Sequence, residues 1–143
     1  MAKQKKNKKQ GNGVIYTALF LNRKELYRLF PAALGKTVEF PHMTVKFRPE
    51  DAHAELFGTE AELKVVGYGN NGRCEGLKVE AVSGSEELNA LLEEIPVQHI
   101  TLSTGNGGKP VETSGLEFAP VGTPVVLKGT FGGFVGAGVK LRP

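Results

Sequence analysis

Two short segments of the chain carry the same pair of polar residues, a histidine followed two positions later by a threonine. They are PHMTVKF at positions 41–47 and QHITLS at positions 98–103. A neutral imidazole can accept a proton while an imidazolium donates one, because the histidine pKa lies near neutrality. A threonine hydroxyl beside each ring can donate a hydrogen bond to developing negative charge. This set suits in-line displacement at phosphorus. The candidate catalytic residues are His42, Thr44, His99 and Thr101.

Each motif is predicted to lie on a β-strand with one polar and one apolar face, because successive side chains of a strand point to opposite faces. One such pair alone would indicate no more than a half-exposed strand. In the first strand, Lys46 shares the face of His42 and Thr44, and in the second, Ser103 shares the face of the other pair. Lys46 and Ser103 are therefore candidate substrate-binding residues; Lys46 would either add positive charge near the phosphate or lie only at the rim of the cleft.

A glycine-rich loop, GNGGK at 105–109, follows the second motif. Its backbone amides would suit an anion nest, with Lys109 supplying positive charge. A flexible turn is the alternative, because asparagine and glycine both favour turns. The loop is not a P-loop, since the GxxxxGK[ST] spacing is missing and Pro110 follows the lysine. Gly105 and Lys109 are further candidate substrate-binding residues.

Two aromatic residues among the late glycines, Phe131 and Phe134, are candidates for stacking on a nucleobase, together with Tyr68. Aromatic rings stack on bases in nucleic-acid sites, although packing in the core is their commoner use. The third histidine, His53, lies in a polar segment without clear periodicity and is expected at the surface. With one cysteine and three scattered histidines, no zinc signature can be written, so we expect no metal and no cofactor.

Each motif follows a strand and a helix in the sequence pattern. The segment 14–34 begins as a strand and continues with a helix that is capped by Asn22 and ended by Pro31. Two strands within 62–83 predict a hairpin, and a helix follows with Ser83 as its expected N-cap. This weak internal symmetry predicts two structural halves that each contribute one motif to a shared cleft.

The last third of the chain changes in composition, with ten glycines between positions 105 and 138. TPVVLKG (123–129) and FVGAGVKL (134–141) predict two strands separated by Gly132 and Gly133. Helices alternate with strands early in the chain, and strands dominate late. The predicted class is therefore α+β with mostly antiparallel sheet.

A chain of 143 residues with 40% hydrophobic content predicts one globular domain with a real core. The pI near 9.0 comes from one segment. Residues 1–10 hold five lysines and no acid, and without them 13 basic residues remain against 15 acidic ones. We expect residues 1–12 to form a disordered basic tail with weak attraction to RNA, and residues 13–143 to form the domain.

The sequence offers no membrane or secretion signal. No apolar run approaches the roughly 20 residues that span a bilayer, and the glycines at 11 and 13 interrupt any secretory apolar region behind the basic N-terminus. Cys74 is alone, which excludes an internal disulfide and fits the cytoplasm. We therefore expect a cytoplasmic monomer without a membrane partner.

The two motifs also carry a resemblance to a known superfamily. Two His-x-Thr-aliphatic strands in a small α+β domain resemble the two-histidine phosphoesterases. The surroundings are most similar to the catalytic domains of 2′,3′-cyclic nucleotide 3′-phosphodiesterases and the cyclic phosphodiesterase domains of fungal-type tRNA ligases. The resemblance rests on HMTVKF (42–47) and QHITLSTG (98–105), is extended by KPVETSGLEF (109–118) and VVLKGTFGG (125–133), and covers roughly residues 14–140.

The resemblance implies a bilobal fold, in which two mostly antiparallel sheets face each other across a central cleft with helices outside. It implies metal-independent hydrolysis of 2′,3′-cyclic phosphates of nucleotides or RNA ends to 2′-phosphates. Thr44 and Thr101 would donate to the phosphate. His99 is expected to activate water and His42 to protonate the leaving O3′, and the symmetry of the motifs leaves the reverse order open. This chain is shorter than the vertebrate enzyme domain, which leaves its peripheral substrate contacts open.

Two alternatives stay open on the sequence alone. Some members of the superfamily degrade cyclic oligonucleotide defence signals, so a 3′,5′-linked cyclic oligonucleotide is a second candidate substrate. The third candidate is a non-catalytic RNA-binding module that takes its affinity from the lysine tail. Binding alone does not need a proton donor opposite an acceptor, and the paired motifs therefore favour an enzyme.

Overall fold

Eight strands pair into one antiparallel sheet in the computed structural model, which describes residues 13–143. The strand order is β2-β6-β5-β4-β7-β1-β3, and β8 pairs with β7. The strands are β1 (Tyr16–Leu21), β2 (Lys36–Thr37), β3 (His42–Phe47), β4 (Glu60–Asn70), β5 (Cys74–Ser83), β6 (His99–Thr104), β7 (Ala119–Phe134) and β8 (Val139–Lys140). The helical elements are α2 (Arg23–Leu29), α3 (Glu86–Leu92) and the 3-10 turns η1 (Ala54–Leu56) and η2 (Pro110–Gly115). The predicted basic tail, 1–12, lies outside the described residues.

The predicted α+β class with antiparallel strands is confirmed, but the predicted pair of sheets in two lobes is wrong. One continuous sheet runs through both halves of the chain, because β7 joins them. The first part of β7 pairs with β4, and its last part pairs with β1 on the other side. This stagger lets the sheet curl without closing.

Glycines allow β7 to continue where two strands were predicted. The strand runs through Gly132 and Gly133 without a break. A Cβ on Gly132 would lie 2.5 Å from the carbonyl oxygen of Lys140, and a Cβ on Gly129 would lie 2.9 Å from the Leu63 side chain. These glycines therefore mark positions where other backbone or side chains approach a strand closely, and they do not end it.

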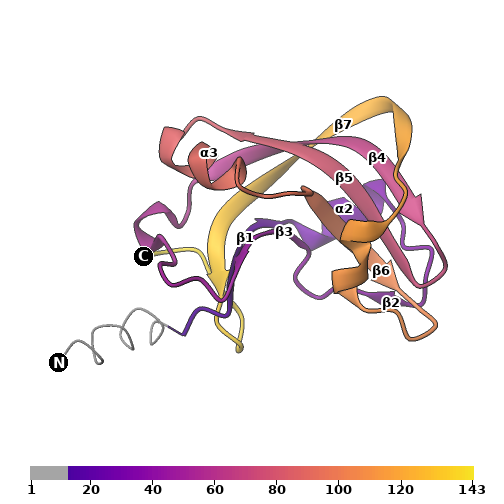
Figure 1. The fold of residues 1–143 in the computed structure, drawn as a ribbon, viewed down its shortest axis with the longest axis horizontal. Helices are drawn as coiled ribbons and strands as arrows, with labels where there is room; N and C mark the ends of the chain where they lie inside the picture. Colours follow the sequence, from indigo (N-terminus) through magenta and orange to yellow (C-terminus); the bar gives the residue numbers. More distant parts are fainter. Residues whose placement is uncertain (1–12) are drawn as a thin grey trace.

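The curl brings the two motif strands together. In the strand order, β6 and β3 are separated by four other strands. Figure 1 shows the long strands β4, β5 and β7 arching over β1 and β3, with β6 and β2 descending on one side. As a result β3 and β6 contact each other, although they share no ladder of hydrogen bonds. The two predicted halves do contribute one motif each to a common region.

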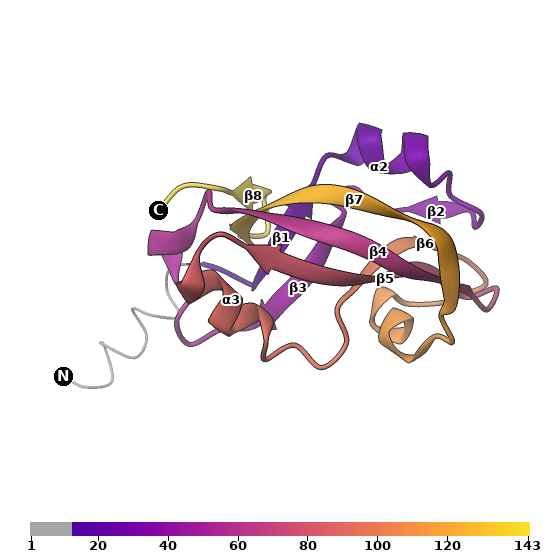
Figure 2. The same ribbon diagram turned by 90° about the horizontal axis from the view of Figure 1, so that it is seen from above.

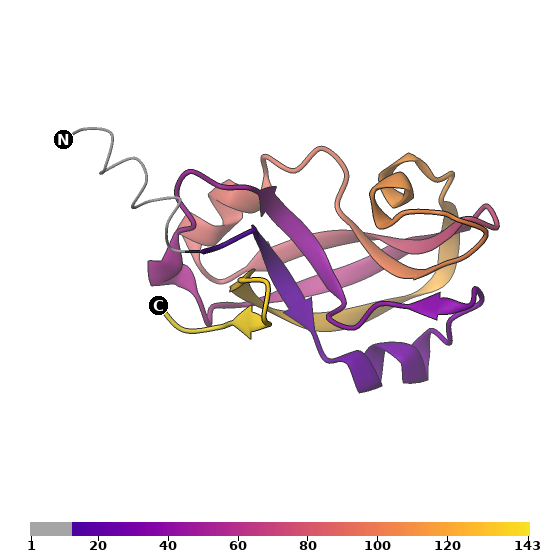
Figure 3. The ribbon, with the colours of Figure 1, turned by 90° about the horizontal axis from the view of Figure 1, so that it is seen from below.

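Helix α2 lies beyond the end of β1, next to β2, and helix α3 lies beside β5 (Figures 2 and 3). The predicted cap of α2 is confirmed, because the Asn22 side chain accepts a hydrogen bond from the Glu25 amide at 2.9 Å. The predicted cap of α3 is wrong. Ser85 caps this helix by accepting from the Leu88 amide at 3.2 Å, whereas the Ser83 hydroxyl donates to the Glu60 carbonyl on the neighbouring strand.

One apolar core joins most of the strands and both helices. Each motif strand contributes fully buried residues to it, Met43 from β3 and Ile100 from β6. Helices α2 and α3 add Leu26 and Leu88. No helix among residues 13–143 has the length and hydrophobicity that a bilayer span requires.

Candidate functional site

A β-bulge in β3 changes which side chains share the face of the first motif. Neighbouring residues of β1 pair with Thr44 and Lys46, so Val45 is an extra residue without a partner in the ladder. A bulge shifts the alternation of side chains by one residue. Phe47 therefore joins His42 and Thr44 on one face, and Lys46 lies on the other, contrary to the sequence-based prediction.

A second bulge occupies the equivalent place in β6. Neighbouring residues of β5 pair with Thr101 and Ser103, and Leu102 has no partner in the ladder. Ser103 therefore turns away from His99 and Thr101. It is fully buried and donates a hydrogen bond to the Glu75 carboxylate at 2.6 Å. The prediction that Ser103 shares a face with His99 and Thr101 is therefore wrong. As for Lys46, the cause is a bulge directly after the threonine.

A phenol hydroxyl connects this second bulge to the first half of the chain. The carbonyl of Leu102 accepts a hydrogen bond from the Tyr27 hydroxyl of α2 at 2.5 Å. The same hydroxyl accepts from the Val38 amide at 3.0 Å. Val38 precedes the first motif by four residues, so Tyr27 ties the approach to one motif strand to the bulge of the other.

The four predicted catalytic side chains line one pocket of about 550 Å³. Strands β3 and β6 each contribute a histidine and a threonine to this pocket. The remaining lining side chains are mostly apolar. They are Tyr16, Val38, Phe47, Pro110, Val111 and Ser114. A pocket with apolar walls and a few converging polar groups is the usual form of a small-ligand site.

Both histidine rings are held in the same way. The Nδ1 atom of His42 lies 2.7 Å from the carbonyl oxygen of Phe40, and that of His99 lies 2.8 Å from the carbonyl oxygen of Val97. A carbonyl can only accept, so Nδ1 carries hydrogen in each ring. The neutral form of either ring then has its lone pair on Nε2, where it can accept a proton.

His42 is enclosed by aromatic rings. Its ring centroid lies 4.7 Å from that of Tyr16 and 5.7 Å from that of Phe20. Burial lowers the pKa of His42 below the ordinary value of 6.5, and a positive charge on His99 lowers it further, against the opposing effect of the Phe40 carbonyl. The electrostatic effect of His99 means that the two rings disfavour simultaneous protonation.

The opposite wall of the pocket is η2, which follows the second motif. A bidentate ion pair holds this turn, with Arg73 Nε 3.0 Å from Glu112 Oε1 and Arg73 Nη2 3.1 Å from Glu112 Oε2. The hydrogen bond from Arg73 lowers the pKa of the Glu112 carboxyl. Val111 on η2 is 77% exposed and faces the same pocket as Phe47, which is 60% exposed.

The glycine-rich loop does not line the pocket. The Gly105 amide donates to the Arg73 carbonyl at 3.1 Å, and the Gly108 amide donates to the Gly105 carbonyl at 2.9 Å. The Lys109 amide donates to Glu112 at 3.2 Å. These amides are already engaged, so the turn interpretation fits the loop better than the anion nest. Gly105 and Lys109 are not brought to the candidate catalytic residues.

The three aromatic residues predicted to stack on a nucleobase make other contacts in the structure. Phe131 is fully buried in the core and packs edge-on against Phe57. Phe134 stacks on Tyr16 with the ring centroids 5.2 Å apart, so it supports a wall of the pocket without lining it. The Tyr68 hydroxyl donates to the buried Glu75 carboxylate.

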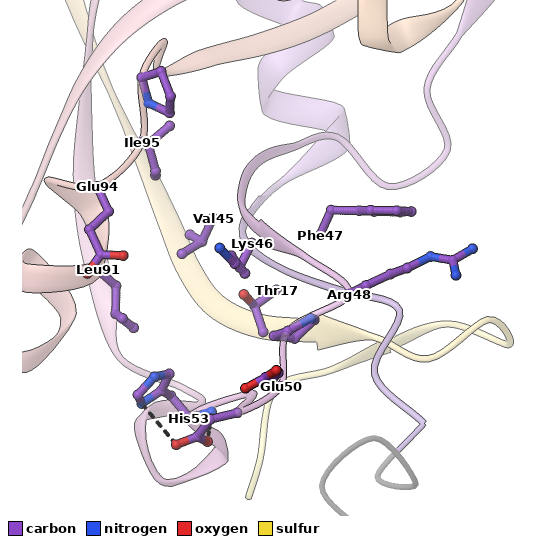
Figure 4. Close-up of a pocket in the computed structure, with 13 residues that line it drawn as sticks. Thr17, Val45, Lys46, Phe47, Arg48, Glu50, His53, Leu91, Glu94 and Ile95 are labelled. Carbon is purple, nitrogen blue, oxygen red and sulfur yellow. Dashed lines mark hydrogen bonds and ion pairs between the residues drawn. The ribbon is translucent and has the colours of Figure 1, made fainter. Parts of the chain in front are cut away.

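Lys46 lies in a second hollow of about 800 Å³, which shares Phe47 with the histidine pocket. Figure 4 shows this hollow between β3 and the segment that follows α3. At its floor, His53 Nδ1 lies 3.8 Å from Asp51 and 3.5 Å from Glu55. The ligand atoms of these three residues fall within 4.8 Å of one another, a cluster that the sequence did not suggest, and such exposed acidic groups are common without a metal.

If the site hydrolyses cyclic phosphates, as the resemblance implies, substitution of Lys46 with alanine is expected to change turnover little, because the bulge directs this side chain into the neighbouring hollow. The kcat/KM of the variant should stay within about threefold of the wild-type value, as for other exposed charges outside a reacting site. Steady-state kinetics at fixed ionic strength measures this. A loss of a hundredfold or more would show that Lys46 reaches the phosphate.

The sequence-based prediction missed the aromatic walls of the pocket, Tyr16 and Phe47, and it missed Thr113, which lies next to the pocket without lining it. Tyr16 and Phe47 enter through the pairing of β1 with the bulged strand, which no local pattern reveals. Thr113 lies behind Thr101, with the two hydroxyl oxygens 2.8 Å apart. In the sequence, Thr113 was indicated only by its place in KPVETSGLEF (109–118), a segment that extends the resemblance.

The site thus combines two equivalently held histidines and two threonines with apolar walls from β1, β3 and η2. This arrangement can accept one proton, donate another and hold an anion between hydroxyl groups. No protein-family model matches the chain, and no curated protein matches it either.

Proposed function

We propose that the protein is a phosphodiesterase of the two-histidine type, which hydrolyses 2′,3′-cyclic phosphates of nucleotides or RNA ends to 2′-phosphates. The observation that carries the proposal is the mirrored placement of His42 and His99. Each ring donates Nδ1–H to the carbonyl two residues earlier and lines the same pocket. Binding alone would not require two imidazoles oriented alike beside two hydroxyl groups.

In the proposed reaction, the Nε2 atom of one histidine takes a proton from water, and the resulting oxygen nucleophile attacks phosphorus. The P–O3′ bond breaks in line, and the other histidine gives its Nε2 proton to O3′. Thr44 and Thr101 donate to the non-bridging oxygens as negative charge builds up. The side chains supply both proton transfers and the charge stabilisation, so the chemistry as proposed does not require a metal.

The environment of His42 favours it as the base, the reverse of the order expected from the resemblance. Its lowered pKa leaves the ring neutral at pH 7 with the Nε2 lone pair available. Burial and a charge on the neighbouring ring both disfavour the charged form of His42, so His42 is poorly suited to be the proton donor of the pair. We therefore assign water activation to His42 and protonation of O3′ to His99.

The pocket walls suit the nucleoside part of such a substrate. The Phe47 ring projects at the pocket edge and is backed by the Arg48 guanidinium, which lies 5.3 Å from its centroid. Val111 on η2 faces the same pocket. Large exposed apolar side chains of this kind mark binding surfaces, and an aromatic ring accepts any base by stacking.

The proposal is tested by incubating the purified protein, in the presence of a chelator, with 2′,3′-cyclic nucleotides and with an RNA that bears a cyclic end. Formation of the 2′-phosphate, identified by phosphorus NMR, is the expected result. A wild-type protein that leaves every cyclic phosphate intact would contradict the proposal, and RNA binding without turnover would favour the non-catalytic alternative.

The pH dependence should reveal the base. Protonation inactivates a base, so kcat/KM must fall as the pH drops through the pKa of His42 in the free enzyme. Because that pKa is lowered, the acidic limb is expected below pH 6.5. A profile of kcat/KM from pH 4.5 to 9 measures it. An acidic limb clearly above 6.5 would argue against His42 as the base.

A 3′,5′-linked cyclic oligonucleotide is the second candidate substrate. One observation favours it: the histidine pocket and the larger hollow beside it share Phe47, so a ligand too large for one could extend past this ring into the other. A panel of cyclic mono-, di- and trinucleotides separates the two candidates by kcat/KM.

A further inference from the structure

We propose that Thr113 is a positioning residue for Thr101, a second hydroxyl that orients the first toward the phosphate. This inference rests on the function proposed above and concerns the same site. Thr113 is fully buried and makes no contact with the pocket space, yet its Oγ1 lies 2.8 Å from that of Thr101. Its hydroxyl group is thus one of the few buried polar groups directed at a candidate catalytic side chain.

The surrounding fold holds Thr113 in one place. Its Cγ2 packs so closely on β5 that a Cβ on Gly76 would come within 2.3 Å of it. The Arg73–Glu112 ion pair fixes the preceding residue, and the Thr113 carbonyl accepts from the Leu116 amide at 3.1 Å. A side chain packed in this way has little rotamer freedom, so its hydroxyl oxygen is a fixed reference point for Thr101.

The numbers of donors and acceptors on the two hydroxyl groups indicate how Thr113 can orient Thr101. A hydroxyl has one proton to donate and two lone pairs to accept with. In the free protein Thr101 donates to Thr113, with the Pro110 carbonyl 3.4 Å away as a weaker alternative. When a phosphate arrives, Thr101 must turn its proton to it. Thr113 can then reverse and donate to Thr101, which polarises the Thr101 hydroxyl and keeps its oxygen in place.

The first motif has no such support. Within residues 13–143, the Thr44 side chain makes no hydrogen bond to protein. The two threonines are therefore not equivalent, although the motifs mirror each other in sequence and in the histidine contacts. Thr101 is held before the phosphate arrives, whereas Thr44 has to be ordered by the phosphate itself.

The test is a double-mutant cycle between Thr101→Val and Thr113→Val, measured by steady-state turnover of a 2′,3′-cyclic nucleotide. Thr113→Val is expected to lower kcat about tenfold with little change in KM, because it removes one hydrogen bond that matters most in the transition state. The same change should have no effect once Thr101 is already valine. Thr113→Ser keeps the hydroxyl and should retain kcat within about threefold of wild type.

Thr104→Val is the matched control, because Thr104 is also a buried threonine on the second motif strand but does not line the pocket. Its kinetics are expected to equal those of the wild type. An equal loss from Thr113→Val in both Thr101 backgrounds would show a merely structural role and overturn the inference. Failure of Thr113→Ser to restore kcat would overturn it as well.

Binding of inorganic phosphate, measured by calorimetry for the same variants, separates this inference from the proposed function. If the wild type hydrolyses no cyclic phosphate, the proposed function fails. A weaker phosphate affinity in Thr113→Val that disappears in the Thr101→Val background would still support Thr113 as a positioning residue. Additive effects on phosphate affinity, or no phosphate binding by the wild type, would overturn the inference.

Discussion

Replacing His42 or His99 with alanine is expected to lower kcat for a 2′,3′-cyclic nucleotide about a thousandfold, since in the proposed mechanism each imidazole supplies a proton transfer that water performs poorly. The two losses should not add, because groups that act as a unit in one transition state show strongly non-additive effects. The double variant should therefore be little slower than either single variant. Single-turnover kinetics with excess enzyme measures these rates without interference from product release.

The third histidine offers a matched control for this experiment. His53 lies in the neighbouring hollow beside Asp51 and Glu55, outside the pocket that contains the other two. His53→Ala should keep wild-type turnover. Thermal unfolding of all the variants checks that they are folded. Wild-type activity in either His42→Ala or His99→Ala would remove that residue from the mechanism.

Replacing Phe131 with alanine is expected to lower the free energy of unfolding by about 3–5 kcal/mol, the usual cost of removing a buried aromatic side chain. Phe131 is fully buried and packs against Phe57 within the core. Small domains have only about 5–15 kcal/mol of stability in total, so this variant should be close to unfolding. Urea denaturation followed by circular dichroism measures the change.

Phe47→Ala is the matched control, because Phe47 is 60% exposed and faces the pocket. Its free energy of unfolding should change by less than about 0.5 kcal/mol, as is usual for exposed positions. Its KM should rise about tenfold, since base stacking on an aromatic ring is worth roughly 1–3 kcal/mol. If Phe47→Ala lowered the free energy of unfolding more than Phe131→Ala does, the assignment of Phe131 to the core and Phe47 to the pocket would be wrong.

The sequence by itself determined the parts of this protein that depend on local spacing. His42 and Thr44 share a face because they lie two residues apart before the bulge, and His99 and Thr101 do so for the same reason. The α+β class, the β4–β5 hairpin and the Asn22 cap also follow from patterns within a few residues. Such features depend on residues that are close together in the chain, and contacts between distant segments did not change them.

The tertiary structure alone decided what lies beyond each threonine. The extra residue in each motif strand is defined by the partner strand, so Lys46, Phe47 and Ser103 could not be assigned to a face from alternation. The same holds for the single curled sheet, which needs the stagger of β7 between β4 and β1. The placement of Thr113 behind Thr101 likewise requires η2 to pack on Gly76. Each of these depends on contacts between residues far apart in the chain, and a local sequence pattern carries no information about them.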